Sequence, residues 1–255
     1  MKIAFCGDSF CRDTTAAGKA PDTNYPILFS SWPYLVAKEY NGDIIAKGLP
    51  GRALFHSYEK LLEHINNVEY IIFCITDPYR LANKYGLSII ASKQRTWPEE
   101  FSPSKIKRLN YVINYYYRDI ISFNWHEVAQ KGLLMQIDEL MIQKQKKCIW
   151  FPCFEHSMQG FVPKSGPIGN TPLFEISETE LINANMTLNE RTNFYNDIRN
   201  RAWNSKKMSR DQQTRVNHMN KENNNNMANL IIDIINNDDF TPQEIKMEKY
   251  FEISK

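Results

Sequence analysis

The stretch MKIAFCGDSF at residues 1–10 decides how the chain is interpreted, because an apolar run is followed at once by Gly7, Asp8 and Ser9. A short apolar run that ends in turn residues is typical of a buried strand leading into a loop. Because strands of this kind recur with longer segments between them, the sequence predicts an α/β fold with a parallel sheet. The predicted strands are Lys2 to Cys6, Asp43 to Lys47, Tyr70 to Ile75, Cys148 to Phe151 and Leu173 to Ile176.

Between the strands, apolar residues recur with the period of a helix, and each stripe is wide enough to pack on a sheet. The stripes consist of Leu54, Tyr58, Leu61, Leu62 and Ile65; of Ile106, Leu109, Val112, Ile113, Tyr116, Tyr117 and Ile120; of Ile137, Leu140 and Met141; and of Met227, Leu230, Ile231 and Ile234. Capping-box spacing at Ser177 with Glu180 and at Thr187 with Glu190 predicts two further helix starts.

We treat residues 1–255 as a single domain, because no segment has the composition of a linker. The connection between the third and fourth strands is unusually long, from about residue 78 to residue 147, and it is rich in aromatic residues. We expect extra helices that cover one face of the sheet, or else a lid or a surface for a protein partner. The polar tail from about residue 238 is expected to dock on the body.

Charge and cysteine pattern argue against several classes of protein. The 31 basic and 29 acidic residues are spread along the chain, so neither a nucleic-acid nor a membrane partner is expected. No stretch approaches the length of a membrane span, and the first apolar run is too short for a signal peptide. The five cysteines form no CxxC pair and are expected to be buried reduced thiols, which favours a reducing compartment such as the cytoplasm. The asparagine run from Asn223 to Asn226 is attributed to compositional bias.

Functional groups are expected in the loops at the carboxyl ends of the strands, where an open parallel sheet forms a crevice. The first of these loops carries Ser9, and the second, Gly48-Leu49-Pro50-Gly51, precedes a helix. Near the other end of the chain, His218 stands shortly before the closing helix. In order and spacing these residues resemble the sequence blocks of the SGNH/GDSL hydrolase family.

The resemblance implies a role for each matching residue. Ser9 would be the nucleophile, and His218 would be the base that accepts its proton. The backbone N–H groups of Ser9 and Gly51 would form the oxyanion hole, in which each donor contributes about 10²–10³ in rate.

The third block of the family supplies an Asn side chain to the oxyanion hole, and this sequence has Asp77 at that position. Asp77 is therefore a candidate for the oxyanion hole only when protonated, because an ionised carboxylate accepts hydrogen bonds but donates none. We therefore expect Asp77 to orient its turn or to pair with Arg80 or Arg52. One of these two arginines could supply the missing positive pole, and both are candidates for substrate binding.

The fourth block normally places an Asp three residues before the His, and Arg215 stands there instead. A triad carboxylate fixes the tautomer of the imidazole, and its loss costs about 10⁴ in rate. Asp211 is a candidate replacement, and the alternative is a Ser-His dyad held by a backbone carbonyl.

The other histidines carry less information. His56, His64 and His126 lie on predicted helices and are interpreted as surface or boundary residues. His156 follows the fourth strand and, with Cys153 and Glu155, is an outside candidate for substrate contact or a metal. Since no spacing matches a zinc pattern, no metal is expected.

By resemblance, the fold would be the three-layer flavodoxin-like SGNH arrangement, with a five-stranded parallel sheet and helices on both faces. The family implies ester hydrolysis without a cofactor, and Arg52 and Arg80 favour a polar substrate such as an acetylated glycan. The departures at Asp77 and Arg215 favour an alternative, a catalytically weakened scaffold used as a binding or structural protein such as a phage virion component. A nucleotide or flavin binder would need a richer phosphate loop than residues 7–10 provide.

Overall fold

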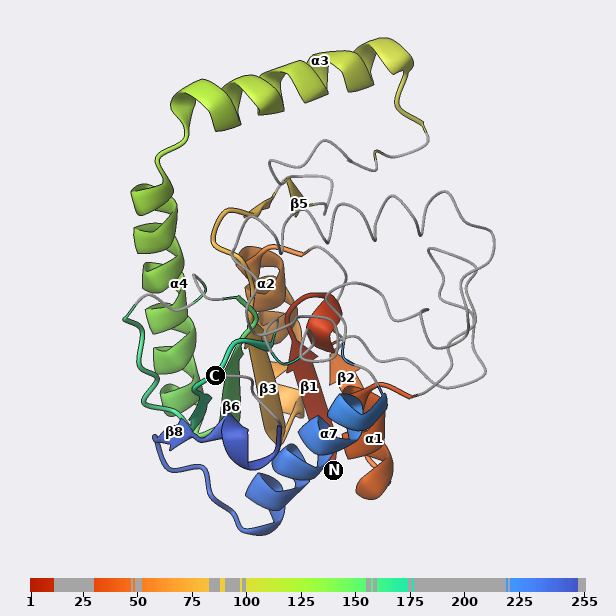
Figure 1. Ribbon diagram of the computed structural model, residues 1–255, viewed down its shortest axis with the longest axis vertical. Coiled ribbons are helices and arrows are strands. Elements are labelled where there is room, and N and C mark those ends of the chain that lie inside the picture. The colour runs from red at the N-terminus through yellow and green to blue at the C-terminus, as the bar shows by residue number, and fades with distance from the viewer. Residues whose placement is uncertain are drawn as a thin grey trace, which may run out of the picture.

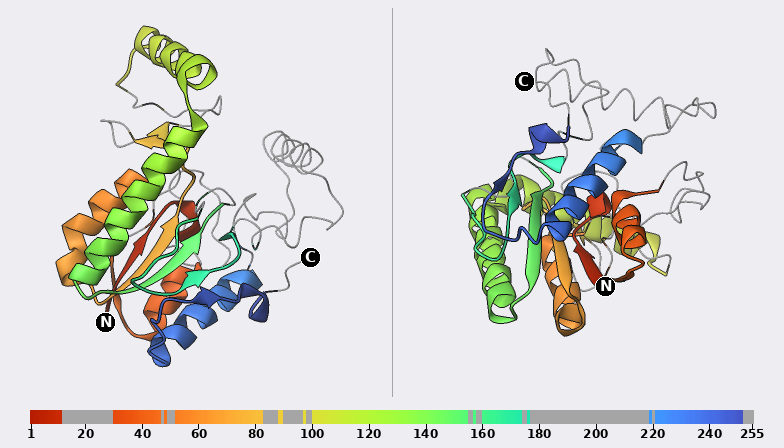
Figure 2. Two further views of the ribbon diagram at one scale, coloured as in Figure 1. Left: turned by 90° about the vertical axis from the view of Figure 1, so that its left-hand side faces the viewer. Right: turned by 90° about the horizontal axis from the view of Figure 1, so that it is seen from below.

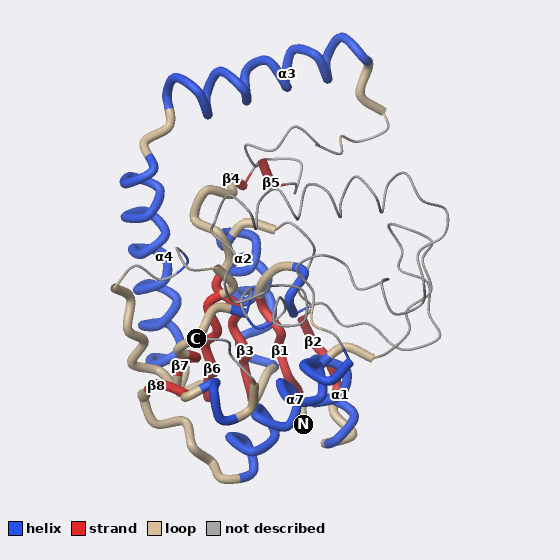
Figure 3. The backbone as a smooth tube through the Cα atoms, in the orientation of Figure 1, coloured by secondary structure: helices blue, strands red, loops and turns tan. Residues whose placement is uncertain are grey.

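A computed structural model shows an α/β fold with a parallel sheet at its centre (Figure 1). The structure describes residues 1–11, 30–46, 48, 52–82, 88–89, 97, 100–154, 157, 160–173, 176, 219 and 221–251. For Ser9, Ala46, Ser88, Ile89, Phe123 and Lys221 this description covers the backbone only. Figure 3 shows the strands side by side with helices around them.

Within the described residues the main sheet has six strands in the order β2-β1-β3-β6-β7-β8, and every neighbouring pair is parallel. The expectation of five strands is therefore wrong. The strands are β1 (Lys2–Cys6), β2 (Asp43–Ala46), β3 (Tyr70–Ile75), β6 (Lys147–Pro152), β7 (Ile168–Gly169) and β8 (Glu244–Ile245). Four of them correspond to predicted strands, with bounds that agree to within a residue. The predicted polar tail contributes β8 to the sheet edge.

The predicted strand from Leu173 to Ile176 is also wrong. Both of these residues are helical and fully buried, and the strand that pairs with β6 lies earlier, at Ile168–Gly169. Apolar residues three positions apart lie on one face of a helix, so a short apolar run of this kind fits either structure. The actual strand is two residues long, too short to form a recognisable pattern.

The strands β1, β3 and β6 are apolar on both faces, as a parallel sheet covered by helices requires. In β1, Ile3 and Phe5 belong to one apolar core, whereas Ala4 and Cys6 belong to the other. The first core contains α1 (Trp32–Glu39) and α7 (Lys221–Asn236). The second contains α2 (Leu54–His64), which runs into η2 (Ile65–Asn67), and α4 (Phe123–Gln143). The helix pairs cover opposite faces of the sheet, which makes three layers (Figure 2).

Between β3 and β6 the chain forms an insertion that extends beyond the sheet. It contains the antiparallel pair β4 (Leu81–Ala82) and β5 (Ser88–Ile89), then α3 (Pro103–Tyr115), the π-helical turn η3 (Tyr116–Ile120) and α4. Ser102 begins α3, because its Oγ accepts a hydrogen bond from the backbone N–H of Lys105 (3.3 Å).

The expectation that the apolar stripe of α3 packs on the sheet is wrong, because only Ile113 of that stripe is buried. At about 1.5 Å per residue, the 21 residues of α4 span about 31 Å. The six residues of β6 span only about 20 Å. The start of α4 therefore lies beyond the carboxyl edge of the sheet, and α3 is carried outward with it (Figure 1).

After α7 the chain ends its described part with β8 and the short helix η6 (Met247–Lys249), whose Met247 is buried in the first core. Among the described residues, none of the helices is long and apolar enough to cross a membrane. All five cysteines are free and buried, which confirms the prediction of buried thiols.

Candidate functional site

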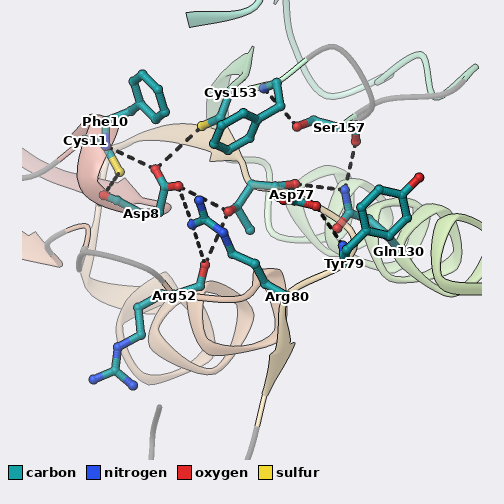
Figure 4. Close-up of polar contacts among 12 residues, drawn as sticks. Asp8, Phe10, Cys11, Arg52, Asp77, Tyr79, Arg80, Gln130, Cys153 and Ser157 are labelled. Atoms are coloured by element: carbon teal, nitrogen blue, oxygen red, sulfur yellow. Dashed lines mark hydrogen bonds and ion pairs between the residues drawn. The ribbon is translucent and has the colours of Figure 1, made fainter. Parts of the chain in front are cut away.

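The loops that follow β1 and β3 meet at the point where the strand order of the sheet reverses. From β1 the chain continues to β2 on one side, whereas β3 pairs with β1 on the other side. In open α/β sheets the crevice outside the carboxyl ends of the strands at such a switch point is the usual place for ligands. Figure 4 shows the polar contacts at this edge, and the residues that carry them form the candidate site.

Gly7 makes the sharp turn that brings Asp8 into this edge. It has a φ of +150°, a backbone conformation that other residues rarely adopt. An added Cβ at this position would lie only 2.7 Å from the Cys11 Sγ and from the Cβ of Cys74. The turn after β1 therefore requires glycine. It leads into η1 (Ser9–Cys11), so that Ser9 begins a short 3₁₀ turn.

Asp8 is completely buried, and both of its carboxylate oxygens accept hydrogen bonds. Its Oδ1 accepts from the backbone N–H of Phe10 (3.1 Å) and from the Cys153 thiol (3.8 Å). Its Oδ2 accepts from the Thr76 hydroxyl (3.3 Å) and from Nη1 of Arg80 (2.6 Å). A buried carboxylate needs partners of this kind, because the loss of hydration is otherwise uncompensated. Asp8 thus joins the loops after β1, β3 and β6.

The ion pair formed by Asp8 and Arg80 is almost entirely enclosed, with 0 % and 13 % of the two side chains exposed. Nη1 of Arg80 also lies 3.4 Å from the carbonyl oxygen of Arg52, and the guanidinium stands 5.2 Å from the centre of the Phe154 ring. The Thr76 hydroxyl lies 3.3 Å from the same Arg52 carbonyl. Arg80 therefore connects the loop after β3 to the start of α2.

Asp77 has a different role from the one its position in the motif implies. Its Oδ1 accepts a hydrogen bond from the backbone N–H of Tyr79 (2.8 Å), and its carbonyl oxygen accepts from the backbone N–H of Arg80 (3.3 Å). This is an Asx turn, so the expectation that Asp77 orients its turn is confirmed. The alternative pairing is not found among the described residues, because Arg80 pairs with Asp8 instead and the guanidinium of Arg52 points away from the cluster in Figure 4.

The loop after β2 packs tightly against the turn of Asp8. A Cβ added to Gly48 would lie 2.3 Å from the Cys11 Sγ and 2.5 Å from the Asp8 carbonyl oxygen. Gly48 therefore permits an approach of two backbones that a side chain would prevent. Gly51 lies outside the described residues, between Gly48 and Arg52, which both contact the cluster.

The start of α7 is tied to the same turn through a relay of hydrogen bonds. Asn224 donates from Nδ2 to the carbonyl oxygen of Met219 (2.9 Å), and its Oδ1 accepts from the backbone N–H of Trp32 (2.8 Å). The indole N–H of Trp32 then donates to the carbonyl oxygen of Phe10 (2.7 Å). His218, Asp211 and Arg215 lie outside the described residues.

Two buried cysteines near Asp8, Cys74 and Cys153, remain protonated at neutral pH. Burial raises the pKa of Cys153 to about 12. Burial, together with contacts to the thiols of Cys11 and Cys153, also raises the pKa of Cys74. Since the thiolate is the reactive form of cysteine, these thiols are poor nucleophiles. In the described ranges no group of three or more His, Cys, Asp and Glu residues could hold a metal ion, while Glu155 and His156 lie outside those ranges.

Sequence reasoning missed several residues of this region. Gln130 of α4 donates from Nε2 to the carbonyl oxygens of Thr76 (3.0 Å) and Ser157 (2.9 Å) and so joins two loops. Asn223 and Asn224 are buried and hydrogen-bonded, whereas the sequence alone indicates only a compositional bias in the asparagine run. The signal that could have found them was their place in the first turn of a helix with an apolar face.

His56 is buried rather than at the surface or boundary, so its predicted position is wrong. It lies in the first turn of α2, where the chain enters the apolar core, and burial lowers its pKa. His64 and His126 are partly exposed, as expected of boundary residues.

Comparison of the chain with protein-family models, with curated proteins and with solved structures gave no match. The functional interpretation therefore rests on the residues and geometry described above.

Proposed function

We propose that the chain is a serine ester hydrolase of the SGNH type, with Ser9 as nucleophile and His218 as general base. In this proposal the backbone N–H groups of Ser9 and Gly51 bind the oxyanion. Asp211 is the candidate for the triad acid, and a Ser-His dyad is the alternative. No cofactor is needed for this chemistry.

One observation carries the proposal: described neighbours of all four motif loops converge on the turn after β1. Gly48 and Arg52, on either side of Gly51, contact the cluster around Asp8. Met219, which follows His218, is linked through two side chains to the carbonyl oxygen of Phe10, which follows Ser9. The covalent chain places consecutive Cα atoms about 3.8 Å apart. The convergence therefore supports a meeting of the proposed catalytic groups at this edge.

The strand order also supports the proposal. Numbered along the chain, the first five strands of the sheet have the order 2-1-3-4-5. This is the flavodoxin-like order, with its ligand crevice at the switch point between the first and third strands. We propose that the fold is the three-layer SGNH arrangement, to which β8 adds one strand at the edge.

In the proposed reaction, Ser9 attacks the acyl carbonyl while His218 accepts the hydroxyl proton. The tetrahedral intermediate collapses to an acyl-enzyme, and His218 passes the proton to the departing alcohol. Water then attacks the acyl group by the same route and releases the acid. Arg80 at this edge and Arg52 beside it favour a polar substrate, such as a small ester or an acetylated glycan.

The experiment combines hydrolysis of 4-nitrophenyl acetate with labelling by a fluorophosphonate probe. We expect the wild-type protein to hydrolyse the ester and to take up the probe, and we expect both to disappear in Ser9→Ala and in His218→Ala. Ser102→Ala, which changes the exposed cap of α3, is the matched control and should be labelled like the wild type. Equal labelling of Ser9→Ala and the wild type would contradict the proposal.

A second candidate is a catalytically weakened SGNH scaffold that serves as a binding or structural protein, for example in a phage virion. The observation that favours it is Asp77, whose carboxylate takes part in a turn and supplies no hydrogen-bond donor to an oxyanion. A protein partner would then bind to the insertion, where large apolar side chains are exposed on α3 and α4. A folded wild-type protein that neither hydrolyses esters nor takes up the probe would favour this candidate.

A further inference from the structure

The buried ion pair of Asp8 and Arg80 requires an explanation beyond stability. Burying two charges costs several kcal/mol per ion, and apolar residues of similar volume often stabilise a protein as well or better. The pair stands at the switch point of the sheet, and Asp8 directly precedes the proposed nucleophile in the sequence. A functional role for one of its members would account for the cost.

Asp8 has no free capacity for such a role. Each of its carboxylate oxygens already accepts two hydrogen bonds, from groups on three loops. It therefore cannot act as a base or hold the imidazole of His218 without losing a partner. What Asp8 does is fix Arg80 in position.

Arg80 does have free capacity. Its Nη1 is used by Asp8 and by the carbonyl oxygen of Arg52. Within the described part of the chain, no hydrogen-bond acceptor pairs with its Nε or Nη2. A guanidinium carries five N–H donors in one plane. The side chain is only 13 % exposed. Asp8 and the ring of Phe154 hold the guanidinium, and with it the remaining donors, in place.

We propose that Arg80 is the side-chain donor of the oxyanion hole and replaces the amide that the Asn of the third block would supply. This inference rests on the proposed function. It selects Arg80 over Arg52, since only the Arg80 guanidinium is drawn into the cluster in Figure 4. Asp77, at the position of the Asn, accepts the Tyr79 N–H, and Arg80 follows three residues later in the same loop.

In this step the Oγ of Ser9 forms a bond to the acyl carbon while the π electrons of the carbonyl move to its oxygen. The proton of Ser9 goes to His218, and the free N–H face of Arg80 donates a hydrogen bond to the new oxyanion without transferring a proton. When the intermediate collapses, the bond to the leaving oxygen breaks and His218 protonates that oxygen.

Asp8 neutralises the charge of Arg80, and this determines whether kcat or KM depends on Arg80. Because the pair is neutral as a whole, it attracts a ground-state ester only weakly. Its fixed N–H groups act when negative charge develops, and a donor of this kind contributes about 10²–10³ in rate. The loss of Arg80 should therefore lower kcat and leave KM of a neutral ester nearly unchanged.

The test uses Arg80→Met and Arg80→Lys, with Arg118→Met as the matched control at an exposed ion pair. For 4-nitrophenyl acetate, we expect kcat of Arg80→Met to fall about 10²–10³-fold. Arg80→Lys should recover part of this loss, and Arg118→Met should behave like the wild type. The rate of fluorophosphonate labelling should fall in parallel, because the attack of Ser9 on phosphorus also develops an oxyanion. Thermal unfolding of each variant shows whether it is folded.

If Arg80→Met fails to fold because Asp8 is left unpaired, Asp8→Asn combined with Arg80→Met removes both charges, and the same loss of kcat is expected. Wild-type kcat in a folded Arg80 variant would overturn the inference while the proposed function stands. An increase of KM confined to an ester with a carboxylate would overturn it too and make Arg80 a group that binds a substrate anion. Absence of Ser9-dependent labelling in the wild-type protein would overturn both proposals.

Discussion

The site around Asp8 and the arm formed by α3, η3 and the start of α4 depart from the usual distribution of side chains in opposite ways. At the site, charged and polar groups such as Asp8 and Thr76 are completely buried. On the arm, large apolar side chains are exposed, including Tyr111 (70 %) and Trp125 (80 %). Proteins normally bury apolar residues and expose charged ones, so both regions are informative.

The two regions differ in the free-energy cost of their unusual side chains and in the interactions that offset this cost. At the site, the loss of hydration is compensated by hydrogen bonds and an ion pair, and the removal of one partner leaves the others unsatisfied. On the arm, removal of one apolar side chain changes the stability of the protein little, because that side chain is already exposed to water. The site is thus sensitive to single changes, and the arm tolerates them.

The largest effect on stability is expected for Asp8→Ala, which leaves Arg80 enclosed without its anion. Breaking a buried ion pair by removing one partner costs about 3–5 kcal/mol. We expect a loss of this size in the free energy of unfolding, measured with urea. The matched change Asp119→Ala removes the carboxylate of an exposed pair on the arm and should leave the urea midpoint unchanged. Similar urea midpoints for the two variants would contradict the claim that the site is more sensitive to single changes than the arm.

A smaller loss is expected for Asn224→Ala, which breaks the relay between α7 and the turn after β1. The change removes the acceptor of the Trp32 N–H and the donor to the Met219 carbonyl. Leaving these buried groups without partners should cost about 1–2 kcal/mol in the free energy of unfolding. The proposal further predicts slower fluorophosphonate labelling, whereas Asn237→Ala, at an exposed helix end, should alter neither property. A lower free energy of unfolding with unchanged labelling would separate the relay from the proposed catalysis.

The pH dependence of stability should report the burial of His56. Burial lowers its pKa below the ordinary value of 6.5, so at acidic pH the unfolded chain binds a proton more readily than the folded protein. Stability from this group is complete above about pH 6.5 and declines as the pH falls below that value. In His56→Gln, urea unfolding between pH 7 and pH 5 should show a shallower decline. A decline as steep as that of the wild type would assign the acid sensitivity to other groups.

The smallest effect is expected for Trp125→Ser on the arm. Because the indole is 80 % exposed, its removal should change the free energy of unfolding by no more than about 0.5 kcal/mol. Ester hydrolysis by this variant should equal that of the wild type. A loss of several kcal/mol would show that the arm is packed in solution, and the comparison would then fail.

The central sheet could be predicted from the sequence because each of its four longer strands contains a continuous apolar run of three to six residues. The two remaining strands could not, since two residues carry no period and both strands are recognised only by their partners. The apolar stripe of α3 correctly predicted a helix, but a stripe does not show whether the helix packs on the sheet. The position of α3 follows from α4, which is longer than β6 and therefore extends beyond the sheet, and this relation is seen only in the assembled structure.

The site was predictable in its location but not in its pairing. Loops at the carboxyl ends of strands converge in any parallel sheet, and this brought Asp8, Asp77 and Arg80 to one edge. Which carboxylate Arg80 binds depends on the directions of side chains. Asp77 turns back to its own backbone, and the turn at Gly7 directs Asp8 inward. Spacing along the sequence does not contain that information.

The claim that Ser9 and His218 meet at the switch point can be measured directly by cross-linking. All five native cysteines are buried, so cysteines introduced by Ser9→Cys and His218→Cys would be the reactive thiols. Dibromobimane joins two thiols only when they lie close together, and the joined product is fluorescent. We predict an intramolecular cross-link in the double variant, and none when Ser9→Cys is combined with Ser102→Cys on the arm. A double variant that yields only separately alkylated cysteines would contradict the account.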